Sequence, residues 1–413
     1  MAKPLLRSAV VLFTRDLRVH DNPALSAALE RAERVVPLFV LDDALLVAFG
    51  APNRIAFLLD ALGDLGSSLR GLGGALVLRR GNVVGQTLRV AIEAGAEAVF
   101  LAEDVSGYAQ ERERRLRRAL AAQRIELEAF PGITVVPPGD LAPVGGDHYR
   151  VFTPYWNRWR EQPRRDVLPA PERVVLPEGI DHGSTPHPGE LAGGTTAPDL
   201  PLGGERAGRR RLEAWLDDGL SRYAALADVP AADATSRLSP YLHFGCVSAG
   251  EVVARSLEHE GAEPFVRQLC WRDFNHQLLA ARPETAHEDL RPRAGSWNED
   301  EEALADWREG RTGVPLVDAG MRQLLREGFM HNRVRLVVGS FLTKQLGIDW
   351  RHGAAHFFEH LVDGDVANNT GNWQWVAGTG TDTRPYRTLS PQRQAERYDP
   401  DGAYVRRYLR EAA

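Results

Sequence analysis

The first 130 residues alternate short apolar runs with longer amphipathic stretches. The apolar runs have the length of buried strands, and the stretches between them carry apolar residues at helical spacing. Strands that alternate with helices indicate βαβ units, which build a parallel sheet. The expected strands are Ala9–Phe13, Arg34–Leu41, Ala75–Arg79, Ala98–Ala102 and Ile125–Glu128, and the expected helices are Asn22–Glu30, Asn53–Arg70, Val83–Ala94 and Tyr108–Gln123.

No G-x-G-x-x-G motif follows the first of these strands. In dinucleotide-binding folds that motif lets backbone amides approach a pyrophosphate. An enzyme that transfers hydride from a nicotinamide is therefore disfavoured.

The rest of the chain divides by composition into a connector and a helical region. Residues 131–205 hold half of the chain's 26 prolines, and proline removes backbone donors that regular elements need. Within this connector, the aromatic segment Val151–Trp159 is expected to pack on a domain. Beyond residue 205 helical patterns dominate, and all nine tryptophans lie after residue 155. We predict an α/β plus all-α chain, with a doubly wound parallel-sheet domain (1–130), a linker (131–205) and a large helical domain (206–413).

Composition disfavours several classes of protein. The hydrophobic fraction of 43% is ordinary for a globular chain, and no long uninterrupted apolar window predicts a membrane span. The start, MAKPLLRSAVVLF, runs into the first strand without a small-residue cleavage site, so we expect a mature cytoplasmic protein. Cys246 and Cys270 are too few for an iron–sulfur cluster or a structural zinc, and we expect no metal. The net charge of −6 argues mildly against nonspecific coating of nucleic acid but allows a local basic groove.

Residues 350–384 carry the most chemistry. Indoles are oxidisable and stack on flat rings. Acids and amides placed among them can set the charge and hydrogen bonding of a polar cofactor. This combination predicts electron transfer to a buried planar redox group, and its members are Trp350, Asp363, Asp365, Asn368, Asn369, Asn372, Trp373 and Trp375.

Four further motifs lie outside that stretch. Phe13–Asn22 reads FTRDLRVHDN, Thr235–Leu242 reads TSRLSPYL, Trp271–Phe274 reads WRDF, and Met330–Arg335 reads MHNRVR. In order, and over essentially the whole chain, they resemble the photolyase/cryptochrome family of flavoproteins, most closely the bacterial class I cyclobutane pyrimidine dimer photolyases. The resemblance implies a helical FAD-binding domain, UV-damaged DNA as the partner, and a monomer.

The resemblance also assigns the residues that hold FAD. It places one group at the phosphates and ribityl chain, and a second group elsewhere on the cofactor. In the second group Arg335 pairs with Asp363 beside the isoalloxazine ring, and Asn369 faces N5 as a catalytic amide. From the residues alone, TSRLS could equally cap a helix, and an acid beside an arginine could be a helix-end salt bridge. The first group is Tyr223, Thr235, Ser236, Leu238 and Ser239, and the second is Arg272, Asn332, Arg335, Asp363, Asp365 and Asn369.

By the same resemblance, Trp373, Trp350 and Trp297 form an electron relay from the flavin toward the surface. Trp271 and Trp375 match the two aromatics that receive a flipped-out lesion, whose flat rings pack on indole. Arg333 would contact a lesion phosphate.

Two departures from the family pattern concern the substrate. Dimer photolyases usually carry Glu where this chain has Gln268, and Met where it has Leu336. Both positions favour a cryptochrome-like photoreceptor without repair activity as the alternative, whereas Trp271 and Trp375 oppose it. A (6-4) photolyase is disfavoured, because His331 is the only histidine in MHNRVRL. We predict light-driven repair of cyclobutane pyrimidine dimers by electron transfer from reduced FAD.

A second, light-harvesting chromophore is also expected in the N-terminal domain. The segment Ala51–Leu58 and Asp104 resemble the antenna pocket of deazaflavin-type members. The residues alone leave the chromophore open between a deazaflavin, a folate and a flavin, and both features could be ordinary helix and loop residues.

Overall fold

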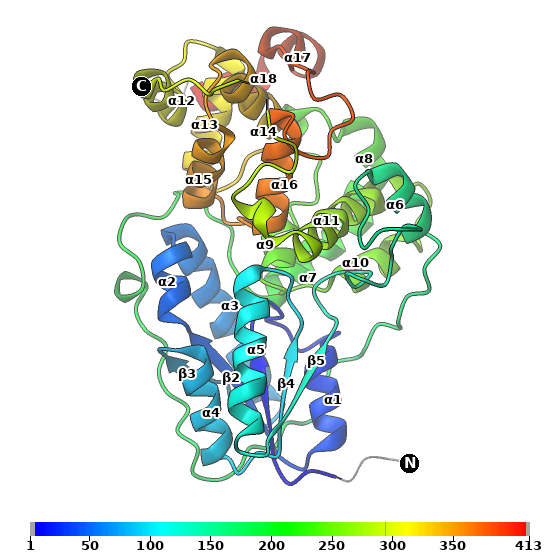
Figure 1. Cartoon of the computed structure of the whole chain (residues 1–413), viewed down its shortest axis with the longest axis vertical. Helices are drawn as coiled ribbons and strands as arrows, with labels where there is room; N and C mark the ends of the chain where they lie inside the picture. The colour runs from blue at the N-terminus through cyan, green and yellow to red at the C-terminus, as the bar shows by residue number, and fades with distance from the viewer. Residues whose placement is uncertain (1–4, 294, 410–413) are drawn as a thin grey trace.

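The computed structural model describes residues 5–293 and 295–409, and it places a parallel sheet below a larger group of helices (Figure 1). The outermost parts of the predicted domains, residues 1–4 and 410–413, lie outside the described residues. The sheet has the order β3-β2-β1-β4-β5, which is the doubly wound arrangement predicted from the sequence. Its strands are β1 (Ala9–Phe13), β2 (Val35–Leu41), β3 (Val77–Arg80), β4 (Ala98–Ala102) and β5 (Glu126–Phe130).

Helices cover both faces of the sheet because alternate side chains of each strand point to opposite faces. In β1, Val11 and Phe13 join a cluster with α1 and α3, whereas Val10 and Leu12 join a cluster with α4 and α5. The helices of this region are α1 (Pro23–Arg31), α2 (Asp43–Phe49), α3 (Pro52–Gly71), α4 (Val83–Glu93) and α5 (Gly107–Ala121).

The connector runs mainly without regular structure from β5 to residue 204. It lies along the sheet, where the Val35 amide donates to the Val175 carbonyl (2.8 Å) and the Leu78 amide donates to the His182 carbonyl (2.8 Å). Its one α-helix in the described chain is α6 (Phe152–Trp159), and a short 3-10 turn, η1, follows at Pro188–Glu190. The prediction that this aromatic segment packs on a domain is confirmed, because α6 lies against α11.

The remainder of the described chain is helical. Two single π-helical turns, η2 (Trp215–Gly219) and η5 (Phe341–Gln345), continue helices, and short 3-10 turns lie at η3 (Pro230–Ala232) and η4 (Pro283–Ala286). Among the described residues we find no helix with the length and apolar character needed to cross a bilayer. The α-helices are α7 (Glu205–Ala214), α8 (Leu220–Leu226), α9 (Ser239–His243), α10 (Ala249–Ser256), α11 (Glu263–Ala281), α12 (Glu301–Glu309), α13 (Pro315–Glu327), α14 (Asn332–Ser340), α15 (Trp350–His360), α16 (Val366–Ala377), α17 (Pro391–Tyr398) and α18 (Ala403–Leu409).

The sheet and the helical region share one apolar core. The largest hydrophobic cluster contains Phe13 of β1 and Phe57 of α3 together with Phe244 and Phe274 of the helical region. The Phe57 and Phe244 rings stack with centroids 4.9 Å apart. The carboxyl ends of the parallel strands therefore face the helical region, which is where doubly wound proteins place their functional residues.

Candidate functional site

A cavity of about 890 Å³ opens between α8, α9, α11, α14 and α16. This volume lies within the range of small-molecule and cofactor sites. Every residue predicted to hold the cofactor lines it: Tyr223, Thr235, Ser236, Leu238, Ser239, Arg272, Asn332, Arg335, Asp363, Asp365 and Asn369.

An ion pair stands on one wall of the cavity. Arg335 on α14 donates through Nη2 to both carboxylate oxygens of Asp363, at 2.9 and 3.2 Å. Arg335 Nε donates to the Met330 carbonyl (2.7 Å), which fixes the plane of the guanidinium. Asp363 lies in the loop between α15 and α16, so the pair joins two elements and is more than a salt bridge at one helix end.

Asp365 forms the centre of a second, buried network. Its Oδ2 accepts from Arg15 Nη2 (2.5 Å) and lies 3.6 Å from His276 Nε2, while its Oδ1 accepts from the Asn368 amide and caps α16. Arg15 also pairs with Asp104, at 3.4 Å. Burial alone would raise the pKa of Asp365, but His276, Arg15 and a neighbouring histidine outweigh it and hold that pKa well below its usual range. Asp365 is therefore an anion at neutral pH. It lines the cavity and is paired with Arg15, which lies just after the sheet strand β1.

Asn369 and Trp373 lie one turn apart on α16, and both line the cavity. Asn369 donates its Nδ2 to the Ala354 carbonyl (3.0 Å), which fixes the orientation of its side-chain amide. The Trp373 ring is buried against Phe357, with centroids 5.0 Å apart, and against Trp307, at 6.0 Å. The contacts with Ala354, Phe357 and Trp307 therefore fix the positions of both side chains.

The TSRLS loop lines the cavity, and within it the Ser236 hydroxyl accepts from the Leu238 amide (3.3 Å). Leu238 is the N-cap of α9 and makes no side-chain capping bond. The hydroxyl of Thr235 is buried at the cavity wall without a hydrogen-bond partner among the described residues. Arg237 has a left-handed backbone with φ of 51°, an uncommon conformation for a non-glycine residue. A buried hydroxyl without a partner costs free energy, which a polar ligand in the cavity would recover.

The predicted lesion residues gather at another part of the same cavity. Trp271, Trp375, Gln268 and Leu336 all line it. One face of Trp271 stacks on Phe152 of α6, with centroids 3.6 Å apart and planes at 4°. The half-buried Trp271 ring is thus held by the connector helix while it contributes to the cavity wall.

Arg333, unlike the other predicted lesion residues, does not line the cavity itself but contacts two residues that do. It donates to Asp228 at 2.7 and 3.2 Å, and its guanidinium lies over the Tyr398 ring, 4.6 Å from the centroid. Asp228 and Tyr398 line the cavity, and the sequence reasoning missed both. Asp228 competes with any phosphate for this guanidinium.

The other two predicted relay residues lie behind the cavity. Trp350 is buried and donates its Nε1 to Asp289 Oδ1 (2.8 Å). Trp297 is half-buried under Arg293, whose guanidinium carbon lies 4.2 Å from the ring centroid. Both tryptophans pack in or against the same hydrophobic cluster as Trp373. Sequence reasoning missed Trp307, because a single buried tryptophan outside a motif gives no functional signal.

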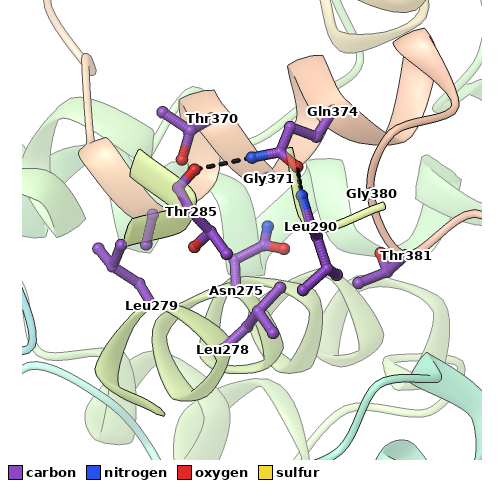
Figure 2. Close-up of a pocket in the computed structure, with 11 residues that line it drawn as sticks. Asn275, Leu278, Leu279, Thr285, Leu290, Thr370, Gly371, Gln374, Gly380 and Thr381 are labelled. Atoms are coloured by element: carbon purple, nitrogen blue, oxygen red, sulfur yellow. Dashed lines mark hydrogen bonds between the residues drawn. The ribbon is translucent and has the colours of Figure 1, made fainter. Parts of the chain in front are cut away.

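A second, small pocket shares lining residues with the large cavity, and Figure 2 shows the side chains around it. Gln374 anchors it, donating to the Thr285 carbonyl (2.7 Å) and accepting from the Leu290 amide (2.9 Å). Its volume of about 10 Å³ suits roughly one water molecule. Asn275 and Thr381 line both spaces, so a water held here would lie next to the cavity. Asn275 was not singled out from the sequence, because nothing near WRDF distinguishes it from a core amide.

The residues compared with an antenna pocket bind the helical region. Asn53 donates to the His360 carbonyl (2.6 Å), and Arg54 donates to the Leu361 carbonyl (3.2 Å). Asp104 faces Arg15. These contacts favour the alternative that Asn53, Arg54 and Asp104 are ordinary helix and loop residues.

Comparison with known proteins agrees with this geometry. The sequence matches the family profile "DNA photolyase" over residues 9–173 and the profile "FAD binding domain of DNA photolyase" over residues 265–413. The deoxyribodipyrimidine photo-lyase of Streptomyces griseus is 52% identical over 98% of this chain and 90% of that protein. A cryptochrome DASH of Gloeobacter violaceus is 35% identical over 98% of this chain and 86% of that protein.

Solved structures give the same result. A class III photolyase from Agrobacterium tumefaciens matches with a TM-score of 0.91 at 33% identity, covering 100% of this chain and 88% of that one. An archaeal photolyase from Sulfolobus tokodaii, solved with two FAD molecules, matches with a TM-score of 0.87 at 30% identity, covering 98% and 90%. Identity above one half across nearly the whole length, together with the shared fold, shows that the chain belongs to the photolyase/cryptochrome family and carries its FAD-binding domain.

Proposed function

We propose that the chain is a deoxyribodipyrimidine photolyase, a lyase that repairs cyclobutane pyrimidine dimers in DNA under light. The observation that carries this proposal is the cavity itself. Its walls hold both the polar groups suited to a flavin and two half-buried tryptophans suited to a flipped-out pyrimidine dimer. A photoreceptor that only binds FAD has no need for the second group.

The described residues fit FAD. The Thr235 hydroxyl lacks a partner where a phosphate or ribityl oxygen would supply one. Arg335 and Asp363 present a paired cation and anion, and Asn369 presents an oriented amide, so charge and hydrogen bonding at a bound ring are set by fixed groups. When bound, reduced FAD supplies the photoexcited electron that opens the cyclobutane ring and is afterwards recovered.

The lesion end of the cavity would bind the dimer through stacking and one amide. Trp271 and Trp375 offer flat faces, and stacking of this kind discriminates little between bases. Gln268 is exposed and can both donate and accept a hydrogen bond at a base edge. A neutral amide lacks the negative charge of the usual Glu, so we expect Gln268 to bind the bases without acting as an anion. Leu336 completes this wall as an apolar contact.

Arg333 would contact a phosphate only after leaving Asp228. Such an exchange of partners is plausible for an exposed pair, since the Asp228 side chain is 50% exposed.

Trp373, Trp350 and Trp297 would return an electron to oxidised FAD and take no part in the repair step. Their increasing access to solvent, from two buried rings to the half-buried Trp297, suits this direction of flow. A second chromophore, a deazaflavin, a folate or a flavin, would harvest light. We further propose a cytoplasmic monomer with UV-damaged DNA as its partner, and no residue role in the repair step requires a metal ion.

The test uses the full chain with FAD reduced before mixing. An oligothymidine that carries cyclobutane dimers is added and illuminated with blue light, and dimers are counted by chromatography in lit and dark samples. Light-dependent loss of dimers is the expected result.

The alternatives predict other outcomes of the same assay. A cryptochrome-like photoreceptor would leave the dimers intact in the light, and that result would overturn the proposal. A parallel oligonucleotide with a (6-4) lesion identifies the third option, in which only that lesion disappears. The variant Gln268→Glu, which restores the usual acid, should repair dimers at least as well as the natural chain.

A further inference from the structure

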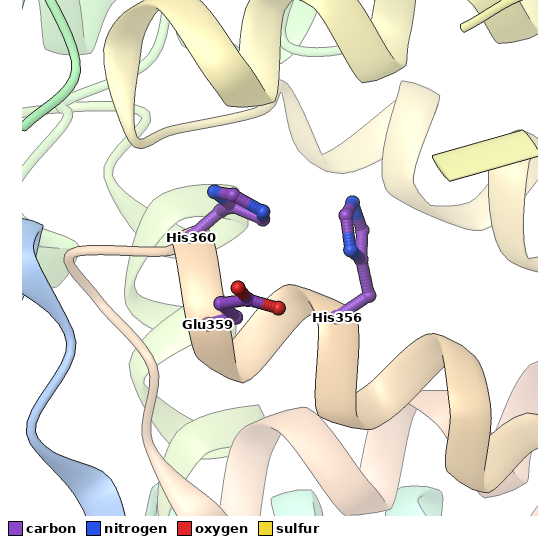
Figure 3. A group of neighbouring side chains, drawn as sticks. All are labelled: His356, Glu359 and His360. Atoms are coloured by element: carbon purple, nitrogen blue, oxygen red, sulfur yellow. The ribbon is translucent and has the colours of Figure 1, made fainter. Parts of the chain in front are cut away.

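We propose that His356, Glu359 and His360 form a binding site for a zinc-class divalent metal ion, apart from the flavin cavity. All three lie in the last two turns of α15 (Figure 3). This site departs from the expectation of a metal-free protein and is independent of the repair activity.

The sequence places the three side chains on one side of the helix. Histidines four residues apart stack one above the other on an α-helix, and a residue three positions on lies beside them. His356-Phe-Phe-Glu-His360 places two histidines four residues apart, the spacing at which helical zinc motifs supply two histidine ligands. In the structure, one ligand atom from each side chain lies within 4.8 Å of the other two.

The buried imidazole points to a missing partner. His356 is only 8% exposed, and its Nε2 has no hydrogen-bond partner among the described residues. The ring packs edge-on against Trp307 (5.6 Å) and His360 (4.6 Å). Burying an unsatisfied nitrogen costs free energy that coordination would offset.

The ligand set indicates the class of ion. Two imidazole nitrogens and one carboxylate oxygen match sites that hold Zn²⁺ and leave a position open for water. Zn²⁺ ligands at about 2.0 Å lie roughly 3.3 Å from each other, so the three atoms must approach by small side-chain rotations. Glu359 is exposed and His360 is half-buried, which leaves a path for the ion and room for this movement.

Coordination would fasten the end of α15. The His360 carbonyl accepts from Asn53 of α3, and the chain then passes to Asp363 at the flavin cavity. A ligand that binds only the folded chain raises its stability, and above the Kd this gain grows with the logarithm of ligand concentration. We therefore expect Zn²⁺ to raise the unfolding temperature without changing the flavin absorption spectrum.

The experiment measures binding of Zn²⁺ alone to the full, untagged, FAD-loaded chain after treatment with a chelator. Equilibrium dialysis should give one ion per chain, and Co²⁺ should give the visible absorption bands of a low-coordinate site. His360→Gln and Glu359→Gln change exposed or half-buried side chains and should each weaken binding at least ~10-fold.

His352→Gln is the matched control, because His352 is an exposed histidine of the same helix one turn earlier. It should keep full binding and the same rise in unfolding temperature. Absence of stoichiometric binding, unchanged affinity in His360→Gln, or equal loss in His352→Gln would each overturn the assignment. If His360→Gln does not fold, Glu359→Gln decides alone.

Discussion

At the scale of single residues, the tryptophans in and near the flavin cavity differ in the residues that surround them. Trp271 has one face on Phe152 and contributes to the cavity wall, whereas Trp297 lies behind the cavity under Arg293. Motif matching predicted which tryptophans these would be. It could not predict Phe152 as the partner of Trp271 or Trp307 as the partner of Trp373, because those contacts join segments that share no sequence pattern.

Trp297→Phe should slow photoreduction of oxidised FAD and leave binding of dimer DNA unchanged. Phenyl is harder to oxidise than indole, and Trp297 is half-buried outside the hydrophobic centre, so the change costs little stability. The measurement is the decay of oxidised-flavin absorbance under blue light with an external reductant. Normal photoreduction in this variant would remove Trp297 from the relay.

Trp271→Ala should show the opposite behaviour. Loss of one stacking face weakens binding by about 1–3 kcal/mol, or roughly 5- to 150-fold in Kd, while photoreduction continues. Fluorescence anisotropy with a dimer-containing oligonucleotide measures it, and the undamaged oligonucleotide is the reference. Equal affinity of the variant and the natural chain for the dimer would contradict the assignment.

At the scale of elements, the packing of α15 on α16 depends on Gly353. A Cβ placed there would lie 2.2 Å from Cη2 of Trp373, a distance that no side chain tolerates. Gly353→Ala should therefore push the helices apart, lower the free energy of unfolding by about 1–3 kcal/mol and reduce FAD occupancy.

Gly63→Ala provides the matched control in the middle of α3, where an added Cβ meets nothing within 4 Å. It should raise the free energy of unfolding by about 0.5–1 kcal/mol, because alanine loses less backbone entropy in a helix. Urea unfolding and the flavin absorbance of both variants test the pair. Two variants of equal stability would show that α15 and α16 adapt freely.

Elements were predictable where the local pattern decides them. The predicted bounds of β1 and β4 agree with the structure, because each is an uninterrupted apolar run that the core buries completely. The short helix α2 was missed, since its seven residues carry no resolvable period and it begins at a single capping acid, Asp42. The edge strands β3 and β5 are shifted by up to two residues, because their ends are half-exposed.

At the scale of the whole molecule, His331 makes stability depend on pH. Its Nδ1 accepts from the Arg333 amide (3.2 Å) at the start of α14, and burial lowers its pKa from 6.5 to about 4. Between these values the unfolded chain takes up a proton that the folded chain rejects. The contribution of His331 to the free energy of unfolding is complete above pH 6.5. It falls as the pH drops toward 4, by at most about 1.4 kcal/mol per pH unit.

Urea unfolding at several pH values measures this slope. His331→Asn keeps a capping side chain without a titrating group, so its slope between pH 6.5 and 4 should be smaller by up to one proton. Identical slopes in both proteins would show that His331 does not titrate in this range.

The network of Arg15, Asp104 and Asp365 lies at the carboxyl ends of β1 and β4, where doubly wound proteins usually bind a ligand. Here an anion of the flavin cavity occupies that position, and the hydrogen bond crosses 350 residues of sequence. Separation of the two regions would take Arg15 away from Asp365, and Arg15 would keep only Asp104 as its counterion. A protease cut in the exposed residues 181–185 should therefore leave a nicked complex that stays together and melts in one transition. Chimaeras that join the two regions of different relatives should therefore fold best when Arg15, Asp104 and Asp365 are all kept.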